Sequence, residues 1–216
     1  MKPHRIITSS TYNSQPVNIN GSGCHGEILD LIQQRMDNCL RRFNRVHVSR
    51  LDITFPDNYL FPGNRVFYNF LWMLRQAMGG EVFDYVWVKE RNRSVNPHFH
   101  LVIFRNGQQH CSGYAVWQKA IEVWGKLLKC DAEGLIHAAI PTINNAYCNY
   151  GVVIDRNAID FQRVYSSVHY WLSYMAKVNT KTTQSGHAYG SSQLRCPAKG
   201  IYYQTPWIVF NSKIVP

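Results

Sequence analysis

Two histidines one residue apart inside an apolar run constrain the fold more than any other feature of this sequence. Residues 97–104 read Pro-His-Phe-His-Leu-Val-Ile-Phe. Successive side chains of a β-strand point to opposite faces, so His98 and His100 share one face and the apolar side chains share the other. The stretch therefore predicts a strand with one packed face and one face that carries two imidazoles. Two histidines at this spacing are more often structural than functional, so the surrounding sequence has to decide.

A second apolar stretch, residues 82–90, precedes this strand and is separated from it by the polar residues 91–96. So short a connection predicts an antiparallel hairpin, which in simple register places Glu90 beside the histidines. Two imidazoles and a carboxylate suit a divalent ion such as Mn²⁺ or Mg²⁺. Glu90, His98 and His100 are therefore the candidate metal ligands. Without the histidines, Glu90 would be expected only to pair with an arginine of the turn.

The rest of the chain alternates between two hydrophobic periods. Helical spacing of apolar residues predicts helices at 27–43, 64–78, 113–129 and 159–178. Alternating or continuous apolar runs predict further strands at 46–55, 135–140, 147–154 and 200–210. Helices that follow strands, with hairpin and crossover connections, predict an α+β fold with a mainly antiparallel central sheet and helices packed on it.

Two polar segments lie outside these elements. Residues 1–25 predict a flexible lead-in to one domain over 26–216, and the segment 179–193 predicts a mobile loop. Residues 21–26 fit the G-x-G-x-x-G spacing of a dinucleotide site. That fingerprint needs a strand directly before it, and the preceding residues make a poor strand, which leaves a Rossmann site as an outside alternative.

Composition narrows the class of protein. The chain has 216 residues, 45% of them hydrophobic, which is enough for a buried core. Its 23 Lys and Arg against 13 Asp and Glu give a net charge of +10, which favours nucleic acid as a partner. No apolar run is long enough to cross a bilayer, so we expect no membrane partner and a cytoplasmic location. The six cysteines are widely spaced without a C-x-x-C pair, which predicts free thiols.

The predicted helix 159–178 carries a second group of reactive side chains. Tyr170, Tyr174 and Lys177 stand at positions i, i+4 and i+7, on one helix face, whereas Tyr165 lies off this face and is expected to be structural. A tyrosine hydroxyl can attack a phosphodiester when a metal polarises the phosphate and a cation stabilises the charge. Aromatic pairs at this spacing more often pack in a core, so this group alone does not decide.

Together the two groups resemble the HUH endonucleases, in which His-hydrophobe-His on a central strand binds a divalent metal and a later helix supplies one or two tyrosines. Residues 98–100 are similar to the first signature, and residues 170–177 to the paired-tyrosine signature of phage-type rolling-circle initiators. Residues 51–55 resemble their first strand, and order and spacing agree over 46–178. Through Trp-Val-Lys-Glu at 87–90, the chain resembles inovirus-type replication proteins and the YagK/YfjJ C-terminal domain family.

The resemblance implies a ferredoxin-like sheet, a bound Mg²⁺ or Mn²⁺, and a tyrosine that becomes linked to the 5′ end of nicked DNA. It implies that the protein initiates rolling-circle replication at a single-stranded origin in the cytoplasm of a bacterial host, together with the host polymerase. Ser173 stands where the paired-tyrosine pattern usually has lysine. We therefore expect Tyr174, with Lys177 three residues later, to be the primary nucleophile and Tyr170 a second or supporting group.

Other functions stay open on the sequence alone. A relaxase or a single-strand transposase would use the same chemistry. A non-catalytic DNA-binding regulator on the same fold would also explain the basic charge, since phosphate contacts and base stacking need no metal. A zinc hydrolase is disfavoured because H-E-x-x-H is absent, and the absence of G-x-x-x-x-G-K-[ST] means that DNA unwinding would need a separate host helicase.

Overall fold

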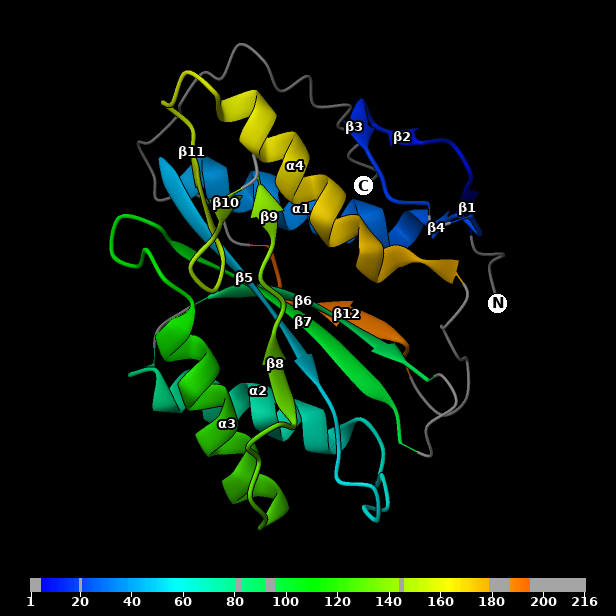
Figure 1. Ribbon diagram of the computed structural model, residues 1–216, viewed down its shortest axis with the longest axis vertical. Coiled ribbons are helices and arrows are strands. Elements are labelled where there is room, and N and C mark those ends of the chain that lie inside the picture. The colour runs from blue at the N-terminus through cyan, green and yellow to red at the C-terminus, as the bar shows by residue number, and fades with distance from the viewer. Residues whose placement is uncertain are drawn as a thin grey trace.

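A computed structural model of the protein describes residues 5–19, 21–80, 83–91, 96–143, 146–178 and 187–194. A six-stranded sheet runs through the centre, and every pairing within it is antiparallel (Figure 1). Its strand order is β11 (Val152–Asp155), β5 (Arg45–Ile53), β7 (His98–Asn106), β6 (Asp84–Glu90) and β12 (Tyr189–Ser191), with β8 (Ile136–Ala138) also paired to β5. The predicted α+β fold with an antiparallel sheet is confirmed.

Helices cover both faces of this sheet (Figure 1). One layer holds α1 (Gly26–Arg42) and α4 (Phe161–Ser173), and the other holds α2 (Arg65–Ala77) and α3 (Tyr114–Leu128). Because strand side chains alternate, the sheet feeds two separate cores. Val48, Val88 and Val102 pack under α1 and α4. Leu51, Phe99 and Leu101 pack against the other layer.

The hairpin predicted around the histidines forms as expected. Strands β6 and β7 pair with Glu90 opposite His98 and Val88 opposite His100. On its other side β7 pairs with β5, which places Asp52 opposite His100. These residues share the sheet face that carries α1 and α4. Val88 and Val102 stand two positions from Glu90 and His100, on the same face, and belong to the core on that side.

The first residues differ from the predicted flexible lead-in. They form two antiparallel pairs, β1 (Ile6–Ile7) with β4 (Cys24–His25) and β2 (Thr11–Tyr12) with β3 (Gln15–Pro16). Val17 is buried in the core shared by α1 and α4, and so is the side chain of Cys24. The glycine-rich residues before α1 follow antiparallel pairs instead of a parallel strand, so the setting of a dinucleotide site is absent from this described region.

The last described residues also differ from expectation. Helix α4 ends at Ser173, and a short 3₁₀ helix, η1 (Tyr174–Ala176), follows it. The strand β12, at residues 189–191, falls within the segment 179–193 that was predicted to be a mobile loop, and it pairs with β6. The predicted strand at 147–154 is divided between β11 and a small hairpin of β9 (Thr142–Ile143) and β10 (Ala146–Tyr147). The strand predicted at 200–210 lies outside the described residues.

Two smaller predictions concern the membrane and the thiols. Among the helices that the structure describes, none combines the length and the apolar character that a bilayer-spanning segment requires. The five cysteines within the described residues are free, as their spacing predicted.

Candidate active site

The two histidines of β7 lie beside a glutamate from β6. His100 is buried, and His98, at the start of the strand, is partly exposed. The Nε2 atom of His100 lies 3.4 Å from Oε2 of Glu90, whose side chain is also buried. The structure therefore brings Glu90 and His100 together directly, and the register of β6 and β7 places His98 opposite Glu90.

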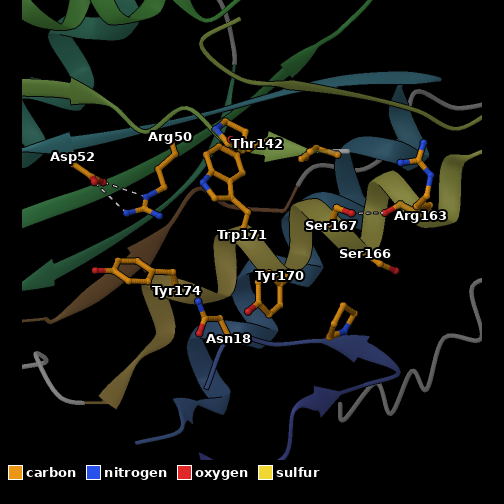
Figure 2. A pocket seen from close by; sticks show the side chains of 13 residues that line it. Asn18, Arg50, Asp52, Thr142, Arg163, Ser166, Ser167, Tyr170, Trp171 and Tyr174 are labelled. Atoms are coloured by element: carbon orange, nitrogen blue, oxygen red, sulfur yellow. Dashed lines mark hydrogen bonds and ion pairs between the residues drawn. The ribbon is translucent and has the colours of Figure 1, made fainter. Parts of the chain in front are cut away.

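Asp52 of β5 orients the inner histidine. Its Oδ1 atom lies 2.6 Å from Nδ1 of His100, and both of its carboxylate oxygens lie 3.1 Å from the guanidinium of Arg50 (Figure 2). An ionised carboxylate only accepts hydrogen bonds, so Nδ1 of His100 carries the proton and donates it. Nε2 therefore presents its lone pair toward Glu90 whenever the ring is neutral.

The surroundings of the site raise the pKa of one of its residues and lower the pKa of others. Burial by itself lowers the pKa of His100, but the hydrogen bonds to Asp52 and Glu90 outweigh burial and raise it. Burial would raise the pKa of Asp52, yet the hydrogen bond from His100 and the charge of Arg50 hold it below its ordinary value. Burial and the neighbouring His100 lower the pKa of His98. His98 is therefore the more readily neutral of the two imidazoles.

Tyr174 reaches this group from the end of α4. Nζ of Lys177 donates a hydrogen bond of 2.6 Å to the Tyr174 hydroxyl and lies 3.5 Å from Oε2 of Glu90. The Tyr174 ring meets the His100 ring edge to face, with centroids 6.2 Å apart. The guanidinium of Arg50 lies over the same ring, 5.0 Å from its centroid. One phenol, two cations and two carboxylates thus surround the inner histidine.

Local backbone structure explains why Lys177 points back toward Tyr174. Ser173 ends α4, and its Oγ accepts a hydrogen bond of 2.8 Å from the Asn18 amide. After the 3₁₀ turn the chain becomes extended, because Lys177 forms a β-bridge with Cys24 and the Val178 amide donates to the carbonyl of Gly23 at 3.1 Å. The N-terminal strands therefore fix the backbone that carries the lysine.

The other tyrosines have different surroundings. Tyr170 lies one helical turn before Tyr174, is 47% exposed, and its ring points toward Asn18 (Figure 2). Both tyrosines line the same cavity, but it is Tyr174 that contacts His100 and Lys177. Tyr165 is buried and donates a hydrogen bond of 2.6 Å to Asp37, which agrees with its expected structural role.

The residues predicted to bind metal fit a divalent ion by their chemistry. Within the described ranges, no group of three or more His, Cys, Asp and Glu side chains is already arranged to hold a metal ion. The donors themselves are suitable, because a carboxylate and two imidazole nitrogens are ligands of Mn²⁺ and related ions. A carboxylate bound to the far nitrogen of a histidine, as Asp52 is to His100, is also typical of metal-binding histidines.

Two residues of this site, Arg50 and Asp52, were not predicted from the sequence. They stand two residues apart on β5, on the face that also carries Val46 and Val48. A charged pair that continues a buried apolar face was the available signal. Their approach to His100 depends on the pairing of β5 with β7, which a single sequence does not give.

Comparison with known proteins identifies the family of the chain. The profile of the YagK/YfjJ C-terminal domain family matches residues 7–192. This range runs from β1 to the end of β12 and includes all the candidate site residues. Searches among curated proteins and among solved structures gave no match. Because the match extends over most of its length, the chain belongs to the YagK/YfjJ C-terminal domain family.

Proposed function

We propose that this protein is an HUH-type endonuclease with a ferredoxin-like sheet, which nicks and rejoins single-stranded DNA through Tyr174. The observation that carries the proposal is the position of the Tyr174 hydroxyl, 2.6 Å from Nζ of Lys177, with the tyrosine ring against His100. A phenol, an ammonium and imidazole and carboxylate donors are the groups that such a transfer requires. The net charge of +10 supports a polyanionic substrate.

The proposed step exchanges one phosphodiester bond for another. The Tyr174 oxygen bonds to the scissile phosphorus while the bond from phosphorus to the 3′ oxygen breaks. The phenolic proton passes to solvent, and the departing 3′ oxygen takes up a proton and leaves as a hydroxyl. The 5′ phosphate stays on the tyrosine, and attack by a 3′ hydroxyl reverses the step. The ammonium of Lys177 stabilises the negative charge that the phenol oxygen carries on the way to attack.

The neighbouring residues prepare the phosphate for attack. A divalent ion, Mg²⁺ or Mn²⁺, bound by Glu90, His98 and His100, would supply Lewis-acid polarisation of a phosphate oxygen. Asp52 keeps the proton of His100 on Nδ1, and the lone pair of Nε2 is therefore available to bind the metal ion. The released 3′ hydroxyl would prime a host polymerase for rolling-circle replication, with a host helicase opening the duplex.

A covalent adduct tests the proposal. The protein is incubated with Mn²⁺ and a pool of random-sequence single strands labelled at the 3′ end, because that fragment stays attached to the enzyme. We expect a labelled adduct whose tyrosyl-oligonucleotide peptide contains Tyr174, its loss in Tyr174→Phe, and its persistence in Tyr170→Phe and in the exposed control Tyr114→Phe. An adduct that survives in Tyr174→Phe would show that another residue is the nucleophile.

A non-catalytic DNA-binding regulator is the second candidate. The basic charge and the exposed ring of Tyr170 favour it, since neither property needs catalysis. Cleavage by the wild type and none by a variant with His98→Ala and His100→Ala supports the enzyme. DNA binding by both proteins without cleavage supports the regulator. If cleavage occurs, substrates with and without hairpins distinguish an initiator from a relaxase or a single-strand transposase.

A further inference from the structure

A groove of about 710 Å³ opens beside Tyr174, between α4, the β9 segment and the end of β5 (Figure 2). Its lining combines aromatic rings with cations and hydroxyls. Helix α4 contributes one whole wall, with Arg163, Ser167 and Trp171 at successive intervals of four residues and Tyr174 beyond them. Residues at this spacing lie on one helix face. The groove therefore begins at a guanidinium, passes an indole, and ends at the candidate nucleophile.

Trp171 is held as a firm surface within this groove. Its indole is partly buried, packs against the core formed under α1 and α4, and extends toward Thr142 (Figure 2). The part of the ring that lines the groove is therefore open while the opposite part is fixed. An aromatic side chain supported in this way loses little freedom when a flat ring stacks on it.

Cations from two different elements lie at the two ends of the groove. Arg163 is at the rim, with half of its side chain exposed, and forms an ion pair with Asp160. Arg50 lies at the inner end, where it contacts Asp52 and the Tyr174 ring. A wholly apolar ligand would offer nothing to these cations, whereas a nucleotide offers a flat base to the indole and a phosphate to a guanidinium.

We propose that this groove binds unpaired nucleotides of the DNA strand next to the scissile phosphate, with a base stacked on Trp171 and a backbone phosphate at Arg163. The inference rests on the proposed function for its substrate, single-stranded DNA, and adds where that strand lies. The strand runs along α4 toward Tyr174, so the base on Trp171 is the one nearer the reacting phosphate. Recognition by stacking accepts any base, which leaves sequence selection to other contacts.

Photochemical crosslinking tests the contact in the unaltered protein. The probe is an oligothymidylate in which one base is replaced by 5-iodouracil, bound in the presence of a chelator so that no cleavage intervenes. Irradiation should join the probe to the peptide that contains Trp171. Crosslinks confined to peptides outside α4, or a stronger affinity for duplex than for single strand, would overturn the proposal.

Binding by variants gives a second measurement. Stacking is worth about 1–3 kcal/mol per base, so Trp171→Leu should weaken oligothymidylate binding by roughly 5- to 150-fold. The matched control is Trp72→Leu on α2, whose ring is 65% exposed and lies outside the groove. Arg163→Gln should reduce the salt dependence of binding by about one phosphate contact, while Arg45→Gln, at an exposed ion pair with Asp155, should not.

The outcomes separate this inference from the nuclease proposal. A wild-type adduct together with unchanged binding by Trp171→Leu overturns the groove and keeps the enzyme. Weaker binding by Trp171→Leu and a crosslink to Trp171, without an adduct in the wild type, keeps the groove as a DNA site and overturns the enzyme. A circular dichroism spectrum and melting curve like those of the wild type show that each variant is folded.

Discussion

The Nδ1 atom of His100 lies 2.6 Å from a carboxylate oxygen of Asp52, its opposite residue on the neighbouring strand. This contact fixes both the tautomer and the direction of the ring, because a carboxylate accepts the Nδ1 proton and leaves Nε2 toward Glu90. Asp52 is in turn held by Arg50. Two charged residues outside the predicted ligand set therefore determine what His100 can bind.

Removing this carboxylate should weaken metal use. We expect Asp52→Ala to raise the Mn²⁺ concentration for half-maximal adduct formation by about 10- to 100-fold, because loss of such a partner lowers the basicity and order of the ligand. Asp52→Asn, which still accepts the hydrogen bond, should lie between Asp52→Ala and wild type. The exposed control Asp155→Ala should match wild type. Equal Mn²⁺ requirements in all four proteins would contradict the role given to Asp52.

Lys177 should matter for the rate of transfer more than for DNA affinity. Its ammonium donates to the Tyr174 hydroxyl at 2.6 Å, so Lys177→Met removes the charge that stabilises the attacking oxygen. We expect adduct formation to slow by about 10²- to 10³-fold in rapid-quench assays. Lys126→Met, at an exposed ion pair with Glu122, should leave the rate unchanged. A wild-type rate in Lys177→Met would remove this lysine from the mechanism.

The buried side chain of His47 should make the folded protein less stable in acid. It is fully buried on the α2 and α3 side, and burial, Arg105 and His110 lower its pKa to about 4. Between pH 6.5 and this value the unfolded chain binds a proton that the native state does not, so stability falls as the pH falls through this window. The loss amounts to at most about 3 kcal/mol.

Urea unfolding at neutral and mildly acidic pH measures this effect. His47→Gln should flatten the difference in unfolding free energy between the two pH values, since glutamine does not titrate. His137→Gln, at an exposed position of β8, serves as the control and should keep the wild-type difference. An unchanged pH dependence in His47→Gln would assign the acid sensitivity to other groups.

A buried ion pair joins α1 to the sheet. Asp84 of β6 pairs with Arg42 of α1 and accepts a hydrogen bond of 3.1 Å from Ser192, just after β12. In Asp84→Ala, the nearly buried guanidinium of Arg42 loses the carboxylate that pairs with it. This loss should lower the unfolding free energy by about 3 kcal/mol. The double variant Arg42→Met with Asp84→Leu should cost less. Asp155→Ala breaks an exposed pair and should cost under about 1 kcal/mol, all measured by denaturant unfolding.

Short-range sequence patterns predicted the class of fold and the part of the site that lies on β6 and β7. Strand periodicity placed His98 and His100 on one face, and the short hairpin fixed Glu90 opposite His98. Both inferences use residues less than ten positions apart, where backbone geometry leaves few choices. Helices α1, α2 and α3 also formed within one residue of their predicted bounds, because each has a clear apolar face.

Long-range pairing supplied what the sequence did not. Asp52 reaches His100 because β5 pairs with β7, 48 residues away, and nothing local encodes that register. The strand β12 carries Tyr, Gly and Ser without an apolar alternation, and it joins the sheet through backbone bonds to β6. Helix α4 ends at Ser173, earlier than predicted, because the following chain is drawn into an extended bridge with Cys24.

That bridge has a practical meaning for anyone who shortens the protein. A fragment that starts at Gly26 would retain every side chain of the candidate active site. It would nevertheless lose the carbonyl of Gly23 and the backbone of Cys24, which hold the segment around Lys177 in place. Fragments for biochemistry or crystallisation should therefore begin before Ile6, where the first strand starts. Loss of activity in a shorter fragment would then reflect the loss of these backbone contacts, because all the candidate catalytic side chains would still be present.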